Sequence, residues 1–208
     1  LRVAEGEEIP MAAGGINEFQ LSAGASTGGW VKPEVARLTP WPDTVLGDYV
    51  MTLVLERCKT AREAVQWLGK MTEEYGARTD NYILADPNEV WLFEQYQGYH
   101  WAAARVPDDC FVVEANSFRL AEINPDDPDN YMCDPDLIPF AIKHGLWDPN
   151  SGEPFHASRA YGTNEINRPR GANGEYAQPY YSLHRIWRGI SLLAPSTNLD
   201  PYEPTKEY

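Results

Sequence analysis

The sequence predicts an α+β domain in which helices cover an antiparallel sheet. Two segments with helical spacing of apolar residues lie before residue 80, and two more follow residue 134. Between residues 81 and 116 the apolar residues form short runs at hairpin spacing, with no helical segment between them. Strands joined by tight turns pair antiparallel, whereas parallel strands need a longer crossover. The order of elements therefore argues against a doubly wound parallel sheet.

The first part of the chain contains one expected strand and two expected helices. Apolar positions roughly alternate from Asn17 to Ala25, which is typical of a strand. A helix is expected from Asp48 to Cys58, because Asp is a favoured N-cap. A second helix, over residues 60–76, opens with a capping box of Thr60 and Glu63 and ends at a glycine.

The later elements follow from turn residues and from helical spacing. The expected strands of the meander are residues 82–85, 90–93, 100–106 and 110–113, separated by Pro, Gly, Asn and Asp. A short helix is expected from Pro135 to His144 after an acidic loop, and residues 164–178 are expected to form an exposed polar loop. A last helix is expected from Tyr181 to Leu193.

Composition and charge exclude several classes of partner. The 208 residues fit one domain, and a hydrophobic content of 43% is enough to build a core. The formal net charge of −14 would repel a polyanion, so neither a nucleic acid nor an anionic membrane is an expected partner. No apolar run reaches the roughly 18 residues that a membrane-spanning helix needs.

Common sequence motifs for metals, cofactors and catalytic nucleophiles are absent. Cys58, Cys110 and Cys133 are odd in number and show no Cys-x-x-Cys spacing, so they are expected to be buried or half-buried free thiols. The run Asp126 to Asp129 is interrupted by a proline and does not match a calcium loop. His184 has no serine or cysteine partner in a local motif, which disfavours a Ser-His enzyme. The sequence predicts neither a metal site nor a cofactor.

Several segments, taken in order, resemble consecutive blocks of a known family. They are Gly15–Leu21, Glu56–Ala64, Ile83–Trp91, His100–Trp101 with Arg105–Asp109, Ala115–Arg119, Asp127–Met132, Gly152–Phe155 and Arg188–Ser196. The chain resembles the dipeptidase A type of cysteine peptidase and its secernin-like relatives over roughly residues 15 to 200. The ordered set makes this resemblance specific, whereas no single block would.

The resemblance implies a fold and a mechanism. The family is similar to penicillin V and bile-salt acylases, which implies an αββα sandwich of two antiparallel sheets with outer helices, as in N-terminal-nucleophile hydrolases. The meander of residues 81–116 is then expected to form one sheet, and Asn17 to Ala25 to belong to the sheet that faces it. The implied nucleophile is a cysteine that processing frees as the first residue, so that its own α-amine serves as the base.

The chain departs from this family pattern at both ends. Residue 1 is Leu, and the family's early segment, which carries the nucleophile, has no counterpart. The family's C-terminal part has no counterpart after Tyr208, and residues are expected to be absent between Pro10 and Met11. We therefore expect residues 1–208 to form a single partial domain that is inactive alone and that associates with the remainder of the same polypeptide.

The resemblance also implies site residues, each with a structural alternative. Asn116 is the expected oxyanion donor, although Asn is also common in turns. Arg185 is expected to favour the thiolate, with Arg188 as its rival and an ordinary surface Arg as the alternative. Ser26 and Thr27 lie where relatives offer a backbone N–H to the oxyanion, and a plain loop at a strand end is the alternative. Nearby Asn17 is a family marker with an expected structural role.

The expected function is hydrolysis of short peptides, with dipeptides as substrates, through a cysteine acyl-enzyme. An acylase-like amidase acting on another amide is the alternative within the enzyme class. A non-catalytic carbohydrate-binding or interaction subunit is the alternative outside it, because 7 Trp and 12 Tyr could provide stacking surfaces. Three unpaired cysteines and the family favour a cytoplasmic location, with secretion as the alternative. The sequence leaves open whether the protein forms a homo-oligomer.

Overall fold

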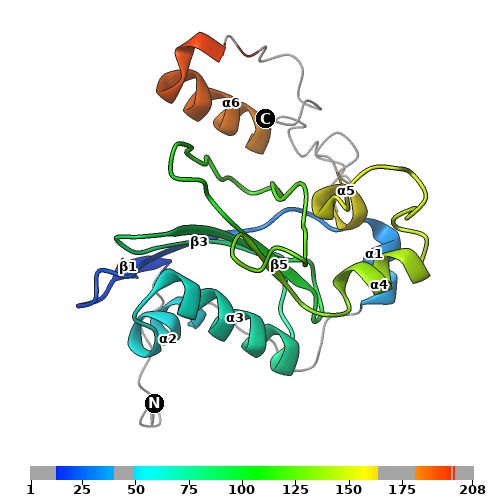
Figure 1. Cartoon of the computed structure of the whole chain (residues 1–208), viewed down its shortest axis with the longest axis horizontal. Helices are drawn as coiled ribbons and strands as arrows, with labels where there is room; N and C mark the ends of the chain where they lie inside the picture. The colour runs from blue at the N-terminus through cyan, green and yellow to red at the C-terminus, as the bar shows by residue number, and fades with distance from the viewer. Residues whose placement is uncertain (1–12, 40–48, 164–180, 198, 200–208) are drawn as a thin grey trace, which may run out of the picture.

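A six-stranded antiparallel sheet organises the protein, each strand pairing with the next strand in sequence (Figure 1). The computed structural model describes residues 13–39, 49–163, 181–197 and 199. The strands are β1 Gly14–Ile16, β2 Ser22–Thr27, β3 Asp80–Ala85, β4 Val90–Gln95, β5 Trp101–Arg105 and β6 Tyr131–Cys133. The helices are α1 Pro33–Leu38, α2 Val50–Arg57, α3 Ala61–Tyr75, α4 Leu137–Lys143, α5 Ala157–Tyr161 and α6 Tyr181–Leu193, followed by the 3-10 turn η2 Pro195–Thr197.

Alternation along the central strands gives the sheet two apolar faces. In β3 and β4, Tyr82, Leu84, Trp91 and Phe93 point to the face that α2 and α3 cover. Leu92 points to the opposite face, where α1, α4, α5 and the irregular segment between β5 and β6 form a second core. The central strands are therefore buried on both faces, which is why their sequences read as nearly continuous apolar runs.

The helix α3 begins where its sequence predicts. The Thr60 side chain accepts a hydrogen bond from the backbone N–H of Glu63, and the Glu63 carboxylate accepts one from the Thr60 N–H in return. The Asp86 carboxylate, in the turn between β3 and β4, accepts another from the N–H of Ala61 at 2.7 Å. Gly76, with a φ of 73°, ends the helix. These contacts fix α3 against the sheet.

The helix α6 lies on the side of the sheet opposite to α2 and α3, with the segment between β5 and β6 beneath it (Figure 1). A Cβ atom at Gly189 would lie 2.7 Å from the Val113 side chain, so the helix passes very close to this segment. The apolar stripe of α6 is only partly covered, because Ile186 is buried whereas Leu193 is 65% exposed. None of the described helices is both long enough and apolar enough to cross a bilayer.

Several expectations from the sequence are confirmed. The protein has α+β architecture, three strands of the meander occur as β3, β4 and β5, and the last helix spans the expected residues 181–193. The helix expected from Asp48 occurs as α2, although Asp48 itself lies outside the described residues. The loop expected over residues 164–178 also lies outside them.

Three expectations are wrong. The strand expected over Asn17 to Ala25 pairs as β2 with β3 in the same sheet, so it does not belong to a facing sheet. Its first residues form a tight turn after β1, in which the Asn17 side chain accepts from the N–H of Leu21 and Gln20 has a φ of 64°. Residues 110–113 form no strand, because β6 occupies the edge of β5 where they would pair.

Two smaller differences have local causes. The helix expected from Pro135 to His144 begins at Leu137, because the Asp134 carboxylate binds the N–H groups of Asp136 and Trp101 and holds the preceding turn against β5. Cys58 is buried and Cys133 is half-buried, as expected, but Cys110 is exposed in the irregular segment.

The close approach of α3 to β5 gives a stability test. A Cβ atom at Gly69 would lie 2.2 Å from the Trp101 ring, so we expect Gly69→Ala to lower the free energy of unfolding by about 1–3 kcal/mol. This loss should appear even though Ala is favoured over Gly in a helix by about 1 kcal/mol. Chemical denaturation measures it.

The matched control is Gly24→Ala in β2. A Cβ atom there would meet no atom within 4 Å, so the free energy of unfolding should stay within about 0.5 kcal/mol of the wild-type value. A Gly69→Ala variant as stable as the wild type would contradict this account of the packing.

Candidate active site

The residues expected at the site come together from three parts of the chain. Ser26 and Thr27 form the end of β2, Asn116 lies in the irregular segment after β5, and Arg185 lies in the second turn of α6. The three parts are far apart in sequence, but hydrogen bonds between their side chains and backbone join them. The structure thus places all four residues in one cluster.

The segment that carries Asn116 has no regular structure of its own, and a buried side chain of the sheet holds it. Asn81, in β3, is fully buried, and its side-chain amide donates to the backbone oxygens of Ser117 at 2.8 Å and Ala115 at 3.3 Å. The same nitrogen lies 3.2 Å from the carboxylate of Glu114. Because buried carbonyl groups need hydrogen-bond partners, Asn81 substitutes for the missing strand partner of this segment.

A second buried side chain, Glu94 in β4, holds the continuation of the segment. One carboxylate oxygen accepts hydrogen bonds from the backbone N–H groups of Arg119 and Leu120, and the other accepts from the Tyr96 hydroxyl at 2.9 Å. Burial raises the pKa of Glu94 to about 7, and these donors act in the opposite direction. Glu94 is therefore a structural carboxylate beneath the site.

The side chain of Asn116 has a defined orientation. Its amide nitrogen donates to the backbone oxygen of Thr27 at 2.7 Å, and its amide oxygen accepts from the Arg185 guanidinium at 2.7 Å. Arg is only a donor, so this contact determines which end of the amide carries the NH₂ group. Ser182, one turn before Arg185, donates to the Asn116 backbone oxygen at 2.9 Å. The amide has two N–H groups, and only one is needed for Thr27.

Glu114 completes the cluster. It is half-buried, and one of its carboxylate oxygens accepts hydrogen bonds from the Ser26 hydroxyl and from Asn81. Burial raises the pKa of Glu114, while these two hydrogen bonds and the charge of Arg185 act to lower it. The Ser26 hydroxyl therefore binds a side chain of the site, and the backbone N–H donation expected at Ser26 and Thr27 stays a prediction.

Two glycines after β2 allow the chain to pass close to the site. A Cβ atom at Gly28 would lie 2.8 Å from the Asn81 amide oxygen, and one at Gly29 would lie 2.8 Å from the backbone nitrogen of Phe118. The Asn81 amide oxygen is buried and has no hydrogen-bond partner in the described part of the chain. A larger residue at Gly29 would displace the segment that carries Asn116, and one at Gly28 would displace the Asn81 side chain that holds this segment.

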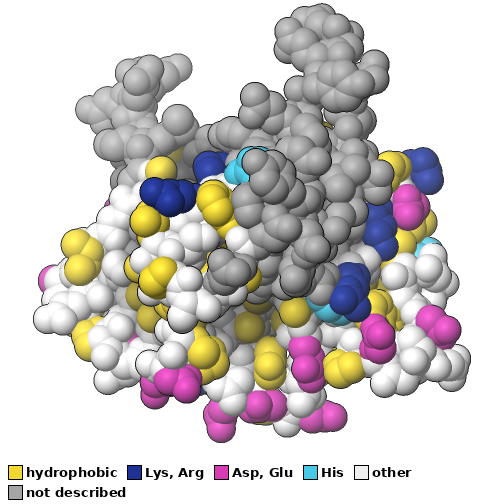
Figure 2. Space-filling model, turned by 90° about the horizontal axis from the view of Figure 1, so that it is seen from above, with side chains coloured by type: hydrophobic (Ala, Val, Ile, Leu, Met, Phe, Trp, Pro, Cys, Tyr) yellow, Lys and Arg dark blue, Asp and Glu magenta, His cyan; other side chains and the backbone are white. Residues whose placement is uncertain are grey.

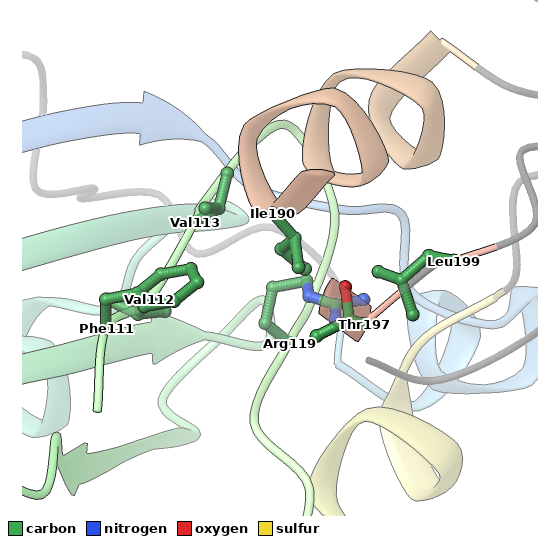
Figure 3. A pocket seen from close by; sticks show the side chains of 7 residues that line it. All are labelled: Phe111, Val112, Val113, Arg119, Ile190, Thr197 and Leu199. Atoms are coloured by element: carbon green, nitrogen blue, oxygen red, sulfur yellow. The ribbon is translucent and has the colours of Figure 1, made fainter. Parts of the chain in front are cut away.

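An apolar cavity lies beside the cluster, between α6 and the irregular segment (Figure 3). Its volume is about 350 Å³, and its lining residues are Phe111, Val112, Val113, Arg119, Ile190, Thr197 and Leu199. Ile190 follows Arg185 by five residues, which corresponds to about 7.5 Å along a helix axis. The cavity and Arg185 therefore share helix α6, although they lie on different faces of it.

Charge is unevenly distributed on the face that bears α6. In the view of Figure 2, Lys and Arg side chains lie mainly in the upper and right-hand parts of this face, and Asp and Glu side chains gather along its lower rim. The net charge of −14 therefore does not make every surface repel anions.

The three cysteines do not have the properties of an activated nucleophile. Burial raises the pKa of Cys58 to about 11 and that of Cys133 to about 12. The pKa of Cys110 is raised as well, by slight desolvation and by the neighbouring Asp109. Thiolates react as nucleophiles, and a reactive thiol needs a lowered pKa. A cysteine nucleophile would have to be a different residue.

Other candidate residues have simpler roles. Arg188 is exposed and has no hydrogen bond to the cluster among the described residues, in contrast to Arg185. Asn17 is structural, because its side-chain amide donates to the backbone oxygens of Leu55 and Cys58 at the end of α2. His184 is exposed on α6.

Sequence analysis missed the residues that support the site. Asn81, Glu94 and Glu114 were not singled out, and neither was Ser182. A signal for the first two was present, since each is a polar residue within an apolar strand that is buried on both faces. Glu114 and Ser182 carry no comparable signal, because their partners are distant in sequence.

Comparisons with known proteins agree with the resemblance found in the sequence. A probable dipeptidase of Latilactobacillus sakei is 31% identical over 189 residues, which are 90% of this chain and 37% of that protein. Probable dipeptidase A of Streptococcus pyogenes serotype M3 is 30% identical over 200 residues, or 95% of this chain and 41% of that protein. Probable dipeptidase B of Lactococcus lactis is 39% identical over 127 residues, or 60% of this chain and 27% of that protein.

The chain thus spans less than half the length of these curated relatives. The sequence model of peptidase family C69 matches residues 5–205, almost the whole chain. The expected relation to dipeptidase A-type enzymes is confirmed, and the chain belongs to peptidase family C69.

Proposed function

We propose that this chain forms part of a dipeptidase that cleaves short peptides through a cysteine acyl-enzyme. The observation that carries the proposal is the Asn116 amide, held between Thr27 and Arg185 in a member of a peptidase family. An amide N–H fixed in this way can stabilise the negative oxygen of a tetrahedral intermediate without reorganising during the reaction.

In the proposed reaction, the thiol of an N-terminal cysteine outside this chain loses its proton to its own α-amine. The thiolate attacks the carbonyl carbon of the peptide bond, and the carbonyl oxygen becomes an oxyanion that accepts a hydrogen bond from Asn116. The C–N bond then breaks, the leaving amine takes the proton, and a thioester forms, which water hydrolyses. Arg185 orients the Asn116 amide and adds positive charge next to the oxyanion and the thiolate.

The αββα sandwich remains part of this proposal. The described sheet carries α2 and α3 on one face, as an outer helical layer would require. On the other face, where a facing sheet would lie, α1, α4 and α5 already cover part of the described sheet. A facing sheet would have to come from parts of the protein beyond the described residues.

The two alternative functions are less well supported. A carbohydrate-binding role needs exposed aromatic side chains, and Trp30, Tyr99 and Phe111 are each about half exposed, whereas the tryptophans of the sheet are buried. What argues against this role is the match to a peptidase family over almost the whole chain. An amidase acting on another amide would use the same oxyanion donor. The names of the relatives favour peptides over other amides.

The first test compares the full-length protein with residues 1–208 alone. We expect the full-length enzyme to hydrolyse dipeptides such as Ala-Ala and to lose this activity after alkylation with iodoacetamide, because the thiol is the nucleophile. We expect residues 1–208 alone to be inactive. Release of free amino acids measures the activity, and turnover by the purified segment would contradict the proposed mechanism.

The second test addresses Asn116. We expect Asn116→Ala in the full-length enzyme to lower kcat by about 100- to 1000-fold with little change in KM, because an oxyanion donor acts mainly in the transition state. Steady-state kinetics with a dipeptide substrate measures both constants.

Arg185 and Arg188 provide the matched pair for this test. Arg185→Met should lower kcat and raise the pH at which the enzyme reaches half of its activity, because a cation that stabilises the thiolate is lost. Arg188→Met, one turn away and exposed, should leave both unchanged. Equal effects of the two substitutions would contradict the role proposed for Arg185.

A further inference from the structure

Glu114 is a half-buried carboxylate that the proposed reaction does not use. Among the described residues, no lysine or arginine forms a salt bridge with it, and its hydrogen bonds come from the neutral side chains of Ser26 and Asn81. Both bonds involve the same carboxylate oxygen, so the other oxygen retains its capacity to accept. A carboxylate removed from water without a cation is unfavourable, and burial accordingly raises the pKa of Glu114.

The position of Glu114 relative to the oxyanion donor is narrowly defined. The Glu114 carboxylate is bonded to Ser26, and the Asn116 amide is bonded to Thr27, the next residue of β2. The Ser26 hydroxyl lies 3.5 Å from the Thr27 backbone oxygen, so the carboxylate and the amide are bonded to neighbouring atoms of β2. Arg185 links them further, because it binds the Asn116 amide and its charge acts on Glu114.

The covalent geometry of a peptide matches this spacing. In the first residue of a peptide, the α-ammonium nitrogen is about 2.5 Å from the carbonyl carbon, since the two are joined through Cα. A group that binds this ammonium while Asn116 binds the carbonyl oxygen must therefore lie within a few ångströms of Asn116. Glu114 is the carboxylate that meets this condition within the described cluster.

We propose that Glu114 binds the α-ammonium group of the substrate and makes the enzyme specific for peptides with a free N-terminus. This inference rests on the proposed function. Within the described residues, Arg185 acts on Glu114 only through its charge, without a salt bridge, so the ammonium would be the cation that bonds directly to this partly desolvated carboxylate. A charge-assisted hydrogen bond is stronger there than in water. Substrates without an amine would leave the carboxylate without this direct ion pair, so they would bind less tightly.

A purely structural role for Glu114 makes a different prediction. Gln at position 114 keeps a carbonyl oxygen that can accept from Ser26 and Asn81, and it removes only the charge. If Glu114 merely held the segment, Glu114→Gln would affect all substrates alike.

The experiment uses the full-length enzyme and two substrates that differ only in the amine. One is Ala-Ala, and the other is propionyl-alanine, which has the same scissile amide and no ammonium group. We expect the wild type to prefer Ala-Ala, and Glu114→Gln to reduce this preference in kcat/KM by about 10- to 100-fold, mainly through a higher KM for Ala-Ala. The rate with propionyl-alanine should not fall in parallel.

Two further variants make the test decisive. Glu122→Gln, an exposed residue outside the cluster, should leave the preference unchanged. Glu114→Asp keeps the charge but shortens the side chain, so it should raise KM for Ala-Ala alone by a smaller factor, which tests the proposal even where Glu114→Gln does not fold. The assignment of Glu114 would be overturned if the Glu114→Gln enzyme is active and keeps the wild-type preference, that is, if kcat/KM is unchanged or falls by the same factor for both substrates. A wild type that hydrolyses neither substrate would overturn the proposed function, and this inference with it.

Discussion

Two buried polar side chains of the sheet, Asn81 and Glu94, hold the irregular segment of residues 114–120, and the rest of the candidate site depends on these contacts. Asn81 donates to backbone oxygens of the segment, and Glu94 accepts from its N–H groups, so the two satisfy groups of both kinds. Each such hydrogen bond contributes only about 1 kcal/mol net, but a buried group left without its partner costs about 1–3 kcal/mol. The segment therefore has a strong preference for this one position.

The position of the segment determines which groups can meet. Asn116 lies between the end of β2 and α6, and it is bonded to both through Thr27 and Arg185. A helix that contacts the sheet mainly through this segment can orient an amide only if the segment itself does not move. Buried polar side chains thus position this irregular segment as precisely as strand pairing would. This arrangement requires a carboxylate, Glu94, in the interior, where burial is unfavourable for its charged form.

Local signals allowed much of the fold to be predicted. Three features show this: the capping box of α3, the hairpin spacing of β3 to β5 and the apolar stripe of α6. In each of them, the residues that form the signal are close together in sequence. The assignment of residues 17–25 to a facing sheet was wrong because the pairing of β2 with β3 joins segments more than fifty residues apart. Asn116 and Arg185 could be named from the resemblance, but Glu114 could not, because its partners, Ser26 and Asn81, are set only by the tertiary fold.

Hydrogen exchange at the backbone N–H groups of Arg119 and Leu120 tests the dependence on the buried carboxylate most directly. Both groups donate to Glu94, so Glu94→Leu should accelerate their exchange by about 10- to 100-fold while the amides of β3 keep their protection. That result would show that the sheet's polar side chain holds the segment. Unchanged protection of these two amides in the folded variant would contradict the account, since the segment would then be held by other contacts.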